Sequence, residues 1–539
     1  MIRKFKFLTY ILLFLALLPN QLFSQHLTED IFKFSRALGY ISSYYVDSVN
    51  SEKLVEDAII DILKELDPHS VYIPADEVKE MNEPLEGNFE GIGIQFNILE
   101  DTIYVISPIS GGPSEKVGIR AGDRIVEIDG ENVAGVNIST TGVRDRLLGE
   151  KGTKVNVGIK RKGVNDILHF TIIRDKIPIY SVDAAYLIDS EIAYIKINRF
   201  AMTTIEEFKE KMNKLKEQGA NSIILDLRGN GGGYLDKAIE LADQFLEQDR
   251  LIVYTKGLKV PKMENFSTSS GIFKKGKVVV LIDEGSASAS EIVSGAIQDW
   301  DRGIIIGRRS FGKGLVQKPM YLPDGSMIRL TVARYYTPTG RLIQKPYESG
   351  AEEYAKELLN RYEHGEFVSK DSIDFPDSLK YYTLKNQRIV YGGGGIMPDI
   401  FVPLDTTSVT DYYSKMVRQG VLNSFVLEYI DNNRKKLKSN YTDFESFKNE
   451  FEVDERILKD LREYGKKNKI DITDKEYKDS KKNFSLIVKG LIARDLWDMS
   501  EYFQIVNTRD EGFKRAIEVI KEWDKYQKQV LNTPQTSTF

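Results

Sequence analysis

A pattern of strand, small-residue loop and helix that occurs twice constrains the fold of this chain most. In the first copy the mainly apolar stretch 222–227 precedes the glycine loop 228–233, and in the second the run 277–282, rich in β-branched residues, precedes the serine-rich loop 285–291. Apolar residues at helical spacing follow each loop. Repeated β-α units are typical of a largely parallel sheet whose ligand sites lie at the carboxyl ends of the strands. We therefore expect both loops to open on the same edge of one sheet.

The serine-rich loop has the sequence Gly285-Ser-Ala-Ser-Ala-Ser-Glu291 and can present a nucleophile. Small neighbours let a substrate backbone come close, and the free N–H groups at the start of the following helix place partial positive charge beside the serine. Such groups stabilise the oxyanion of an acyl-transfer reaction. The alternative is a serine that only caps the helix in a packing turn, which this loop would favour if it stood alone.

A serine nucleophile needs a base that removes its proton near neutral pH, and the usual base is histidine. The chain has four histidines, and none lies in a motif of the predicted α/β core. The candidate that is left is Lys313, between Gly312 and Gly314 in an apolar context. Burial disfavours the ammonium form and lowers the pKa of a lysine from about 10.4 by several units, so a buried lysine can accept a proton.

Gln317 is the nearest uncharged group that could orient a neutral Lys313 amine. A fully extended chain would place the Cα atoms of these two residues roughly 13 Å apart. We therefore expect the length of the lysine side chain and a bend at Gly312 or Gly314 to close the gap.

Residues 87–176 have a different character, with short strands separated by glycine turns. The stretches Gly118–Ile125, Asp129-Gly130 and Leu147–Val155 resemble a PDZ domain. This resemblance implies that the backbone N–H groups of one loop hold the terminal carboxylate of a peptide, while the following strand edge pairs with the peptide. The loop consists of Gly91, Ile92, Gly93 and Ile94. The alternative is a β-rich scaffold that binds no ligand.

Three stretches taken together resemble the C-terminal processing, or tail-specific, serine proteases. They are Leu225–Gly233, Gly285–Glu291 and Gly312–Gln317, and the similarity extends from about Leu54 to Val402. The resemblance implies an α/β core of crotonase/ClpP-like β-α units, with an inserted PDZ-like β-rich domain and helical N- and C-terminal segments.

The same resemblance implies roles for the site residues. Ser288 would be the nucleophile, Lys313 the general base and Gln317 the residue that orients the lysine. The backbone N–H groups of the oxyanion hole would belong to Ala289 and to Gly232 or Gly233. The choice between the two glycines stays open at this point.

The first loop departs from the family in one detail, since Gly229 and Asn230 stand where two asparagines are commoner. Backbone groups act there, so the expectation is unchanged. We expect Asp226 and Arg228 to fix the glycine loop rather than to act as acid or base. No pair of histidines has the spacing of metal ligands, and no cofactor is expected.

The N-terminus predicts export. Arg3, Lys4 and Lys6 precede the apolar run Phe7–Leu18, which is short for a membrane span. The chain has no cysteine, which excludes thiol catalysis, disulfides and a lipid-modified cysteine. We predict an exported, periplasmic protein, and an uncleaved N-terminal segment would instead anchor it to the membrane.

The predicted organisation has five parts. They are a signal peptide (1–24), an N-terminal helical segment (25–86), a PDZ domain (87–176), a protease core (177–403, with an insertion at 350–390) and a C-terminal helical extension (404–539). We predict an exported serine endopeptidase that recognises protein C-termini through the PDZ domain and cleaves peptide bonds by a Ser-Lys(-Gln) mechanism. The alternative is a non-catalytic peptide-binding scaffold that retains the protease fold.

The expected partners are protein substrates with flexible C-termini. A net charge of only −5 indicates no nucleic-acid role. The sequence leaves open whether an adaptor protein takes part and whether the chain forms a homo-oligomer.

Overall fold

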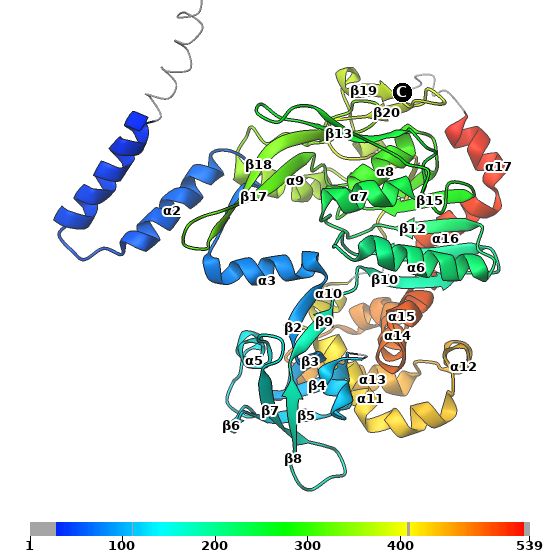
Figure 1. Ribbon diagram of the computed structural model, residues 1–539. Coiled ribbons are helices and arrows are strands. Elements are labelled where there is room, and N and C mark those ends of the chain that lie inside the picture. The colour runs from blue at the N-terminus through cyan, green and yellow to red at the C-terminus, as the bar shows by residue number, and fades with distance from the viewer. Residues whose placement is uncertain (1–27, 110, 407–409, 533–539) are drawn as a thin grey trace, which may run out of the picture. The chain divides into compact units, whose positions relative to one another are not determined.

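A computed structural model describes residues 28–109, 111–406 and 410–532 (Figure 1). The predicted signal peptide, residues 1–24, lies outside the described residues. The chain divides into two compact units, one containing the residues up to Ala75 together with Pro319–Leu330, and the other containing the rest. Within the described ranges, no helix combines the length and the apolar character that crossing a membrane requires.

The smaller unit is mainly helical. Residues 28–44 form one helix and Ser51–Lys64 form α2. The strand β1, Val71–Ile73, pairs antiparallel with the beginning of β18, Met327–Tyr336.

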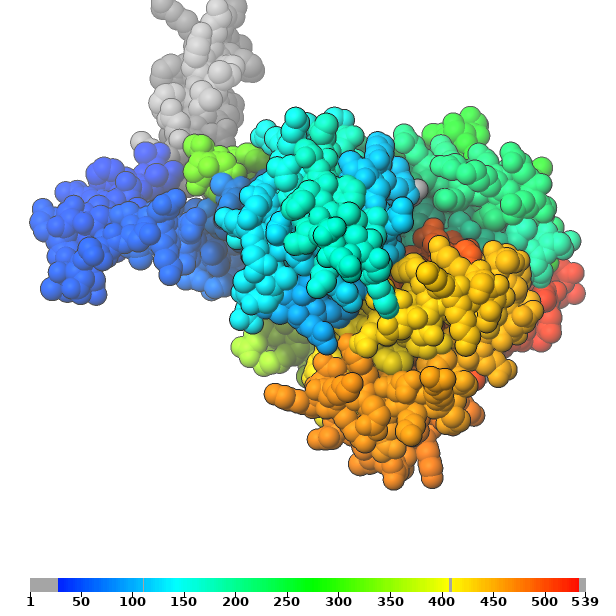
Figure 2. All heavy atoms as spheres, turned by 90° about the horizontal axis from the view of Figure 1, so that it is seen from below, coloured from blue at the N-terminus to red at the C-terminus, as the bar shows by residue number. Residues whose placement is uncertain are grey.

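A β-rich domain lies near the start of the larger unit, after α3 (Ala75–Glu86). Its main sheet contains, in spatial order, β3 (Ile94–Leu99), β4 (Thr102–Pro108), β5 (Arg124–Ile128), β7 (Lys154–Lys160) and β8 (Leu168–Ile173). The domain also contains β2 (Asn88–Gly91), which pairs with β9 (Asp175–Pro178), the short strand β6 (Glu131–Asn132), and the helices α4 (Pro113–Lys116) and α5 (Thr140–Leu147). Apolar residues of the sheet and of α5 share one core, and Figure 2 shows the domain as a body of cyan spheres.

A six-stranded sheet forms the centre of the larger unit. Its strands, in spatial order, are β10 (Val182–Leu187), β11 (Ile192–Ile197), β12 (Ser222–Asp226), β15 (Lys277–Ile282), β16 (Ile304–Gly307) and β21 (Ile400–Phe401). The pair of β10 and β11 is antiparallel, and the other pairs are parallel. The carboxyl ends of β12 and β15 are therefore neighbours, which brings the glycine loop and the serine loop to the same edge, as the repeated β-α units predict.

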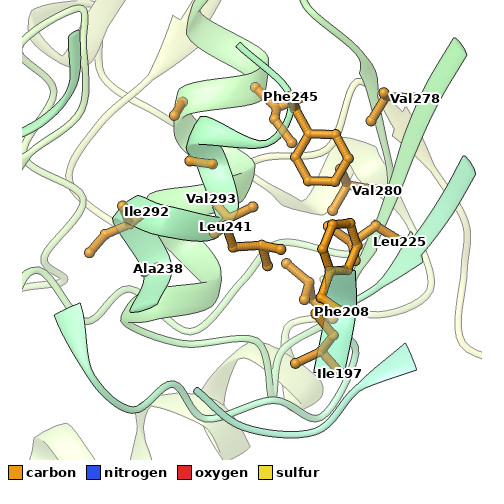
Figure 3. Close-up of a cluster of buried hydrophobic side chains, with 14 of the residues drawn as sticks. Ile197, Phe208, Leu225, Ala238, Leu241, Phe245, Val278, Val280, Ile292 and Val293 are labelled. Atoms are coloured by element: carbon orange, nitrogen blue, oxygen red, sulfur yellow. The ribbon is translucent and has the colours of Figure 1, made fainter. Parts of the chain in front are cut away.

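Helices cover both faces of this sheet. One face packs against α6 (Thr204–Glu217), α7 (Leu235–Asp243) and α8 (Ala289–Asp299), and the other against α16 (Glu511–Lys521). Figure 3 shows the first interface, where side chains of the sheet meet Phe208, Leu241 and Phe245 of the helical layer. Each fully buried side chain of this size stabilises the fold by about 1.5–3 kcal/mol. This packing makes the loop-bearing edge of the sheet a rigid support.

Several further elements adjoin the sheet. β13 (Leu251–Lys256) pairs with β14 (Met263–Phe266) and with the end of β18. β17 (Leu315–Tyr321) begins just after the predicted base. The segment predicted as an insertion contains α9 (Ala351–Glu363), two short 3-10 helices (Lys370–Ser372 and Asp377–Leu379) and the antiparallel pair β19 (Lys380–Tyr382) and β20 (Ile389–Tyr391).

The chain ends in a series of helices. They are α10 (Asp411–Arg418), α11 (Val421–Asn440), α12 (Phe444–Glu450), α13 (Glu455–Lys467), α14 (Asp474–Leu496), α15 (Met499–Val506), α16 and α17 (Trp523–Tyr526). Most of α10 to α15 pack around one apolar core of their own, and these residues are yellow to orange in Figure 2.

Candidate active site

Ser288 stands at the turn between β15 and α8 in a strained conformation. Its φ is 55° and its ψ −109°, in the region of positive φ that residues other than glycine rarely adopt. Such strain costs on the order of 1–3 kcal/mol and clusters at active sites. Ser288 occupies the N-cap position of α8, and its N–H donates to Glu291 Oε2 in the first turn of the helix. An ordinary N-cap residue has an extended conformation, so capping by itself does not explain the positive φ of Ser288.

The two other serines of the loop have structural partners. Ser286 Oγ donates to the carbonyl of Leu227 at 2.9 Å, and Ser290 Oγ donates to the carbonyl of Asn230 at 2.9 Å. Both serines are fully buried, whereas Ser288 is partly exposed. Of the three serines in this loop, only Ser288 is thus accessible.

Lys313 and Gln317 meet through their side chains. Lys313 Nζ donates to Gln317 Oε1 at 3.2 Å. The chain bends at Gly312, whose φ is 89°, and the strand β17 begins only at Leu315. Lys313 lies just before β17 and Gln317 lies within it, so their two long side chains span the distance between the backbone positions. The lysine is partly buried, as a lysine base requires.

Glu291 connects Ser288 to Lys313. Its Oε2 atom accepts hydrogen bonds from the N–H groups of Ser288 (2.7 Å) and Lys313 (2.9 Å). Its Oε1 atom accepts from Ser310 Oγ at 2.5 Å and from the N–H of Gly312 at 2.7 Å. Burial raises the pKa of this carboxyl to about 7, although the hydrogen bonds it accepts act in the opposite direction. Sequence reasoning assigned Glu291 no role.

Tyr335 makes a second connection between the same two residues. Its hydroxyl donates to the main-chain carbonyls of Ser288, at 3.1 Å, and of Lys313. The side chain is almost completely buried, and burial raises the pKa of its hydroxyl well above the ordinary value. Sequence reasoning missed these contacts, because nothing local distinguishes Tyr335 from Tyr336.

The glycine loop lies directly against Ser288. The carbonyl of Asn230 accepts from the N–H of Ala287 at 3.0 Å. A Cβ atom on Gly232 would lie 2.9 Å from Ser288 Cβ, so only glycine fits there. The two loops thus form one surface around the nucleophile.

The two candidate glycines of the oxyanion hole differ in how their N–H groups are used. The N–H of Gly232 donates to Asn230 Oδ1 at 2.9 Å. Phe200 pairs with Gly233 through the neighbouring residues, since the Phe200 N–H donates to the Gly232 carbonyl and the Tyr234 N–H donates to the Phe200 carbonyl. The Gly233 N–H therefore points away from this pairing.

Asp226 and Arg228 form a buried ion pair at the start of the glycine loop. Arg228 Nη2 lies 2.7 Å from Asp226, and Lys196 Nζ lies 3.7 Å from it. Burial alone would raise the pKa of Asp226, but the two cations hold it well below its usual range. A carboxylate that stays ionised in this way supports the loop and is unsuited to proton transfer near neutral pH.

The β-rich domain carries a groove of about 700 Å³ between β3 and α5. Ile92, Gly93 and Ile94 of the predicted carboxylate loop line it, whereas Gly91 does not and pairs with Asp175 in β2 and β9. Side chains of α3 and α5 form other parts of the wall. They include Glu80, Glu83, Arg144 and Leu147.

Comparisons with known proteins give matches along most of the chain. Residues 191–351 match the model of peptidase family S41, residues 91–172 the PDZ domain, residues 19–77 the N-terminal domain of the activating protease CtpB, and residues 412–498 a family of unknown function.

Two curated relatives are similar over more than half of this chain. A carboxy-terminal-processing protease of Bartonella bacilliformis is 38% identical over 325 residues, which are 59% of this chain and 74% of the relative. The carboxy-terminal processing protease CtpA of Bacillus subtilis is 36% identical over 58% of this chain and 66% of its own length. Among solved structures, a photosystem II D1 C-terminal processing protease is 29% identical with a TM-score of 0.33, covering 57% of this chain and 88% of its own.

Proposed function

Because this chain belongs to peptidase family S41, the carboxy-terminal processing proteases, we propose that it cleaves peptide bonds with Ser288 as nucleophile and Lys313 as general base. The predicted resemblance to the tail-specific serine proteases, and with it the prediction of a peptide-bond hydrolase, is confirmed. The single observation that best supports the proposed mechanism is the accessible Ser288 in a strained conformation, held to Lys313 through Glu291.

The proposed reaction begins with proton transfer from Ser288 to a neutral Lys313 amine, which Gln317 orients through the hydrogen bond at 3.2 Å. The Ser288 oxygen then attacks the carbonyl carbon of the scissile peptide bond, and the carbonyl oxygen becomes an oxyanion. Lys313 returns the proton to the leaving amine as the peptide bond breaks. Water later attacks the acyl-enzyme by the same route, which frees Ser288.

We assign the oxyanion hole to the N–H groups of Ala289 and Gly233. Ala289 is the first residue of α8, so its N–H has no partner within the helix. Gly233 is preferred to Gly232 because the Gly232 N–H already donates to Asn230. Two such donors stabilise a tetrahedral intermediate in the way known for acyl-transfer enzymes.

The proposed substrates are proteins with flexible C-termini that bind in the groove of the PDZ domain. The groove has apolar walls, formed in part by Ile92, Ile94 and Leu147, and these suit an apolar terminal side chain. The loop at its end would hold the terminal carboxylate with backbone N–H groups, and the edge of β3 would pair with the peptide.

We also propose a cellular location for the protein and a fold type for its core. We propose that residues 1–24 act as a signal peptide and that the mature protein works in the periplasm, on the basis of the basic residues followed by a short apolar run. We further propose that the parallel β-α units of the core are of the crotonase/ClpP type, with the five-part organisation predicted above.

The proposal is tested by incubating the mature protein with a substrate protein that ends in a flexible apolar tail. We expect cleavage by the wild type and none by Ser288→Ala or Lys313→Ala. Lys318→Ala is the matched control, because Lys318 is an exposed lysine of the same segment. Equal cleavage by the wild type and by both site variants would reject the mechanism, and absence of cleavage by the wild type would favour the scaffold alternative.

A further inference from the structure

Arg228 lies between two carboxylates that come from distant parts of the chain. Its Nε and Nη2 atoms donate to Asp226, at 3.0 and 2.7 Å. Its Nη1 atom donates to both carboxylate oxygens of Asp510, each at 2.8 Å. Asp226 ends β12, whereas Asp510 belongs to the C-terminal helical series. The guanidinium therefore joins the catalytic core to this series.

Asp510 completes an ion-pair network of alternating charges that also contains Lys196, Asp226 and Arg228. Asp226 faces two cations, Arg228 and Lys196. The Asp226 and Arg228 side chains are 1% and 20% exposed, so water screens their charges little. Without Asp510, this cluster would hold two positive charges and one negative charge. Leaving one charge of a buried network unpaired is strongly destabilising.

A short stretch of backbone connects Arg228 to the turn that carries Ser288. The Arg228 N–H donates to Asp226 at 3.0 Å, which fixes the residue at the start of the glycine loop. One residue further on, the N–H of Gly229 donates to Asp283 at 2.8 Å. The next residue, Asn230, accepts from the N–H of Ala287 through its carbonyl. Three backbone hydrogen bonds in succession thus connect Arg228 to the turn of Ser288.

The helix α16 holds Asp510 from the other side. Asp510 caps this helix by accepting from the N–H of Phe513 at 2.6 Å. The ring of Phe513 lies edge-on to that of Tyr194, with 5.4 Å between their centroids, and the Tyr194 hydroxyl donates to Asp226 at 2.7 Å. Packing on the sheet thus fixes the carboxylates of Asp226 and Asp510, which both bind Arg228.

We propose that Asp510 is a positioning residue of the active site. Because Asp510 belongs to the C-terminal helical series, this series is required for the full catalytic rate. This inference rests on the proposed peptidase function. Asp510 acts on the reaction by fixing Arg228, so that the loop 229–233 keeps the Gly233 N–H in place beside Ser288. Small displacements of such donors cost large factors in rate.

Asp510→Asn separates this role from helix capping. Asparagine caps a helix as well as aspartate does, so the start of α16 is preserved while the charge opposite Arg228 is lost. Asp454→Asn is the matched control, because Asp454 caps α13 in the same helical series by accepting from the N–H of Ile457 at 2.9 Å.

We expect kcat of Asp510→Asn to fall about tenfold or more with KM changed less than about twofold, and Asp510→Glu to recover part of the loss. Asp454→Asn should keep the wild-type kcat. The proposal is overturned if kcat of Asp510→Asn stays within about twofold of that of the control.

A second measurement does not depend on activity. Hydrogen exchange of residues 226–235 is compared in the full-length Ser288→Ala protein with and without Asp510→Asn. We expect the second change to accelerate exchange in the glycine loop, and unchanged exchange there would overturn the proposal. If the wild type cleaves nothing, the proposed function fails, and this comparison still decides whether Asp510 orders the loop.

Discussion

The main-chain N–H groups of Ser288 and Lys313 donate to the same oxygen of one buried carboxylate, that of Glu291, at 2.7 and 2.9 Å. The hydroxyl of Tyr335 donates to the main-chain carbonyls of the same two residues. Two buried side chains therefore set the separation of the Ser288 and Lys313 backbones before any substrate binds. Such preorganisation is what a proton transfer between fixed groups requires.

Glu291→Gln tests whether the Glu291 carboxylate holds Ser288 and Lys313 in place. Four donors point at its two oxygens, and the amide group of glutamine turns one of these acceptors into a donor. An unsatisfied buried group costs about 1–3 kcal/mol, and we expect kcat to fall about a hundredfold because the base loop shifts. Peptidase kinetics and thermal unfolding check this. The control Glu206→Gln changes an exposed carboxylate on α6 and should leave both unchanged, and a Glu291→Gln variant with wild-type kcat would contradict the prediction.

The raised pKa of Glu291 predicts opposite pH trends for stability and activity. Burial raises this pKa from 4.5 to about 7, so between these values the folded state keeps a proton that the unfolded state has lost. The free energy of unfolding of the wild type, relative to Glu291→Gln, should fall by on the order of 3 kcal/mol as pH rises through this window.

The activity of the wild type should instead rise through about pH 7, because the four donors need an ionised acceptor. Denaturant unfolding and kcat measured between pH 4.5 and 8 check both trends. A stability difference that is flat or rises with pH would show that the carboxyl is ionised throughout.

Tyr335→Phe should lower kcat about tenfold and the free energy of unfolding by about 1–3 kcal/mol, because the buried carbonyl groups of Ser288 and Lys313 lose their shared donor. The control is Tyr336→Phe, a neighbouring tyrosine whose ring stacks on Tyr254 with centroids 4.7 Å apart. Steady-state kinetics and urea denaturation compare the two variants. Equal kcat values for the two would show that the hydroxyl of Tyr335 does not hold the site.

Two alanine substitutions in the glycine loop should differ sharply. A Cβ at Gly232, where φ is 107°, would lie 2.9 Å from Ser288 Cβ, so Gly232→Ala should reduce cleavage by more than about a hundredfold. A Cβ at Gly231 meets nothing within 4 Å, so Gly231→Ala should leave activity close to that of the wild type. Cleavage assays on both folded variants check this, and similar activities would mean that the loop does not contact the nucleophile in solution.

Much of the framework could be predicted from local patterns. The run 277–282 was expected as a strand with a helix after the serine turn, and β15 and α8 lie there. Both predictions rest on periodicity among neighbouring residues, which the backbone geometry of strands and helices imposes. The stretch around Lys313 is also local, and Lys313 and Gln317 meet through their long side chains.

The contacts that fix the site could not be predicted in this way. Glu291 stands three residues after Ser288, a spacing typical of helix capping, and nothing nearby shows that it also accepts from the Lys313 N–H. Tyr335 and Asp510 lie in a strand and at a helix start that look ordinary in the sequence. Their partners come from segments far away along the chain.

The sequence by itself determined which residues can act: a serine among small neighbours, a lysine between glycines, and a glycine loop at the end of a strand. Only the tertiary structure decided which of them meet, and what holds them. The physical reason is that backbone periodicity and glycine conformation are local properties. The burial that raises the pKa of Glu291 and the pairing of Arg228 with Asp510 depend instead on packing between distant segments.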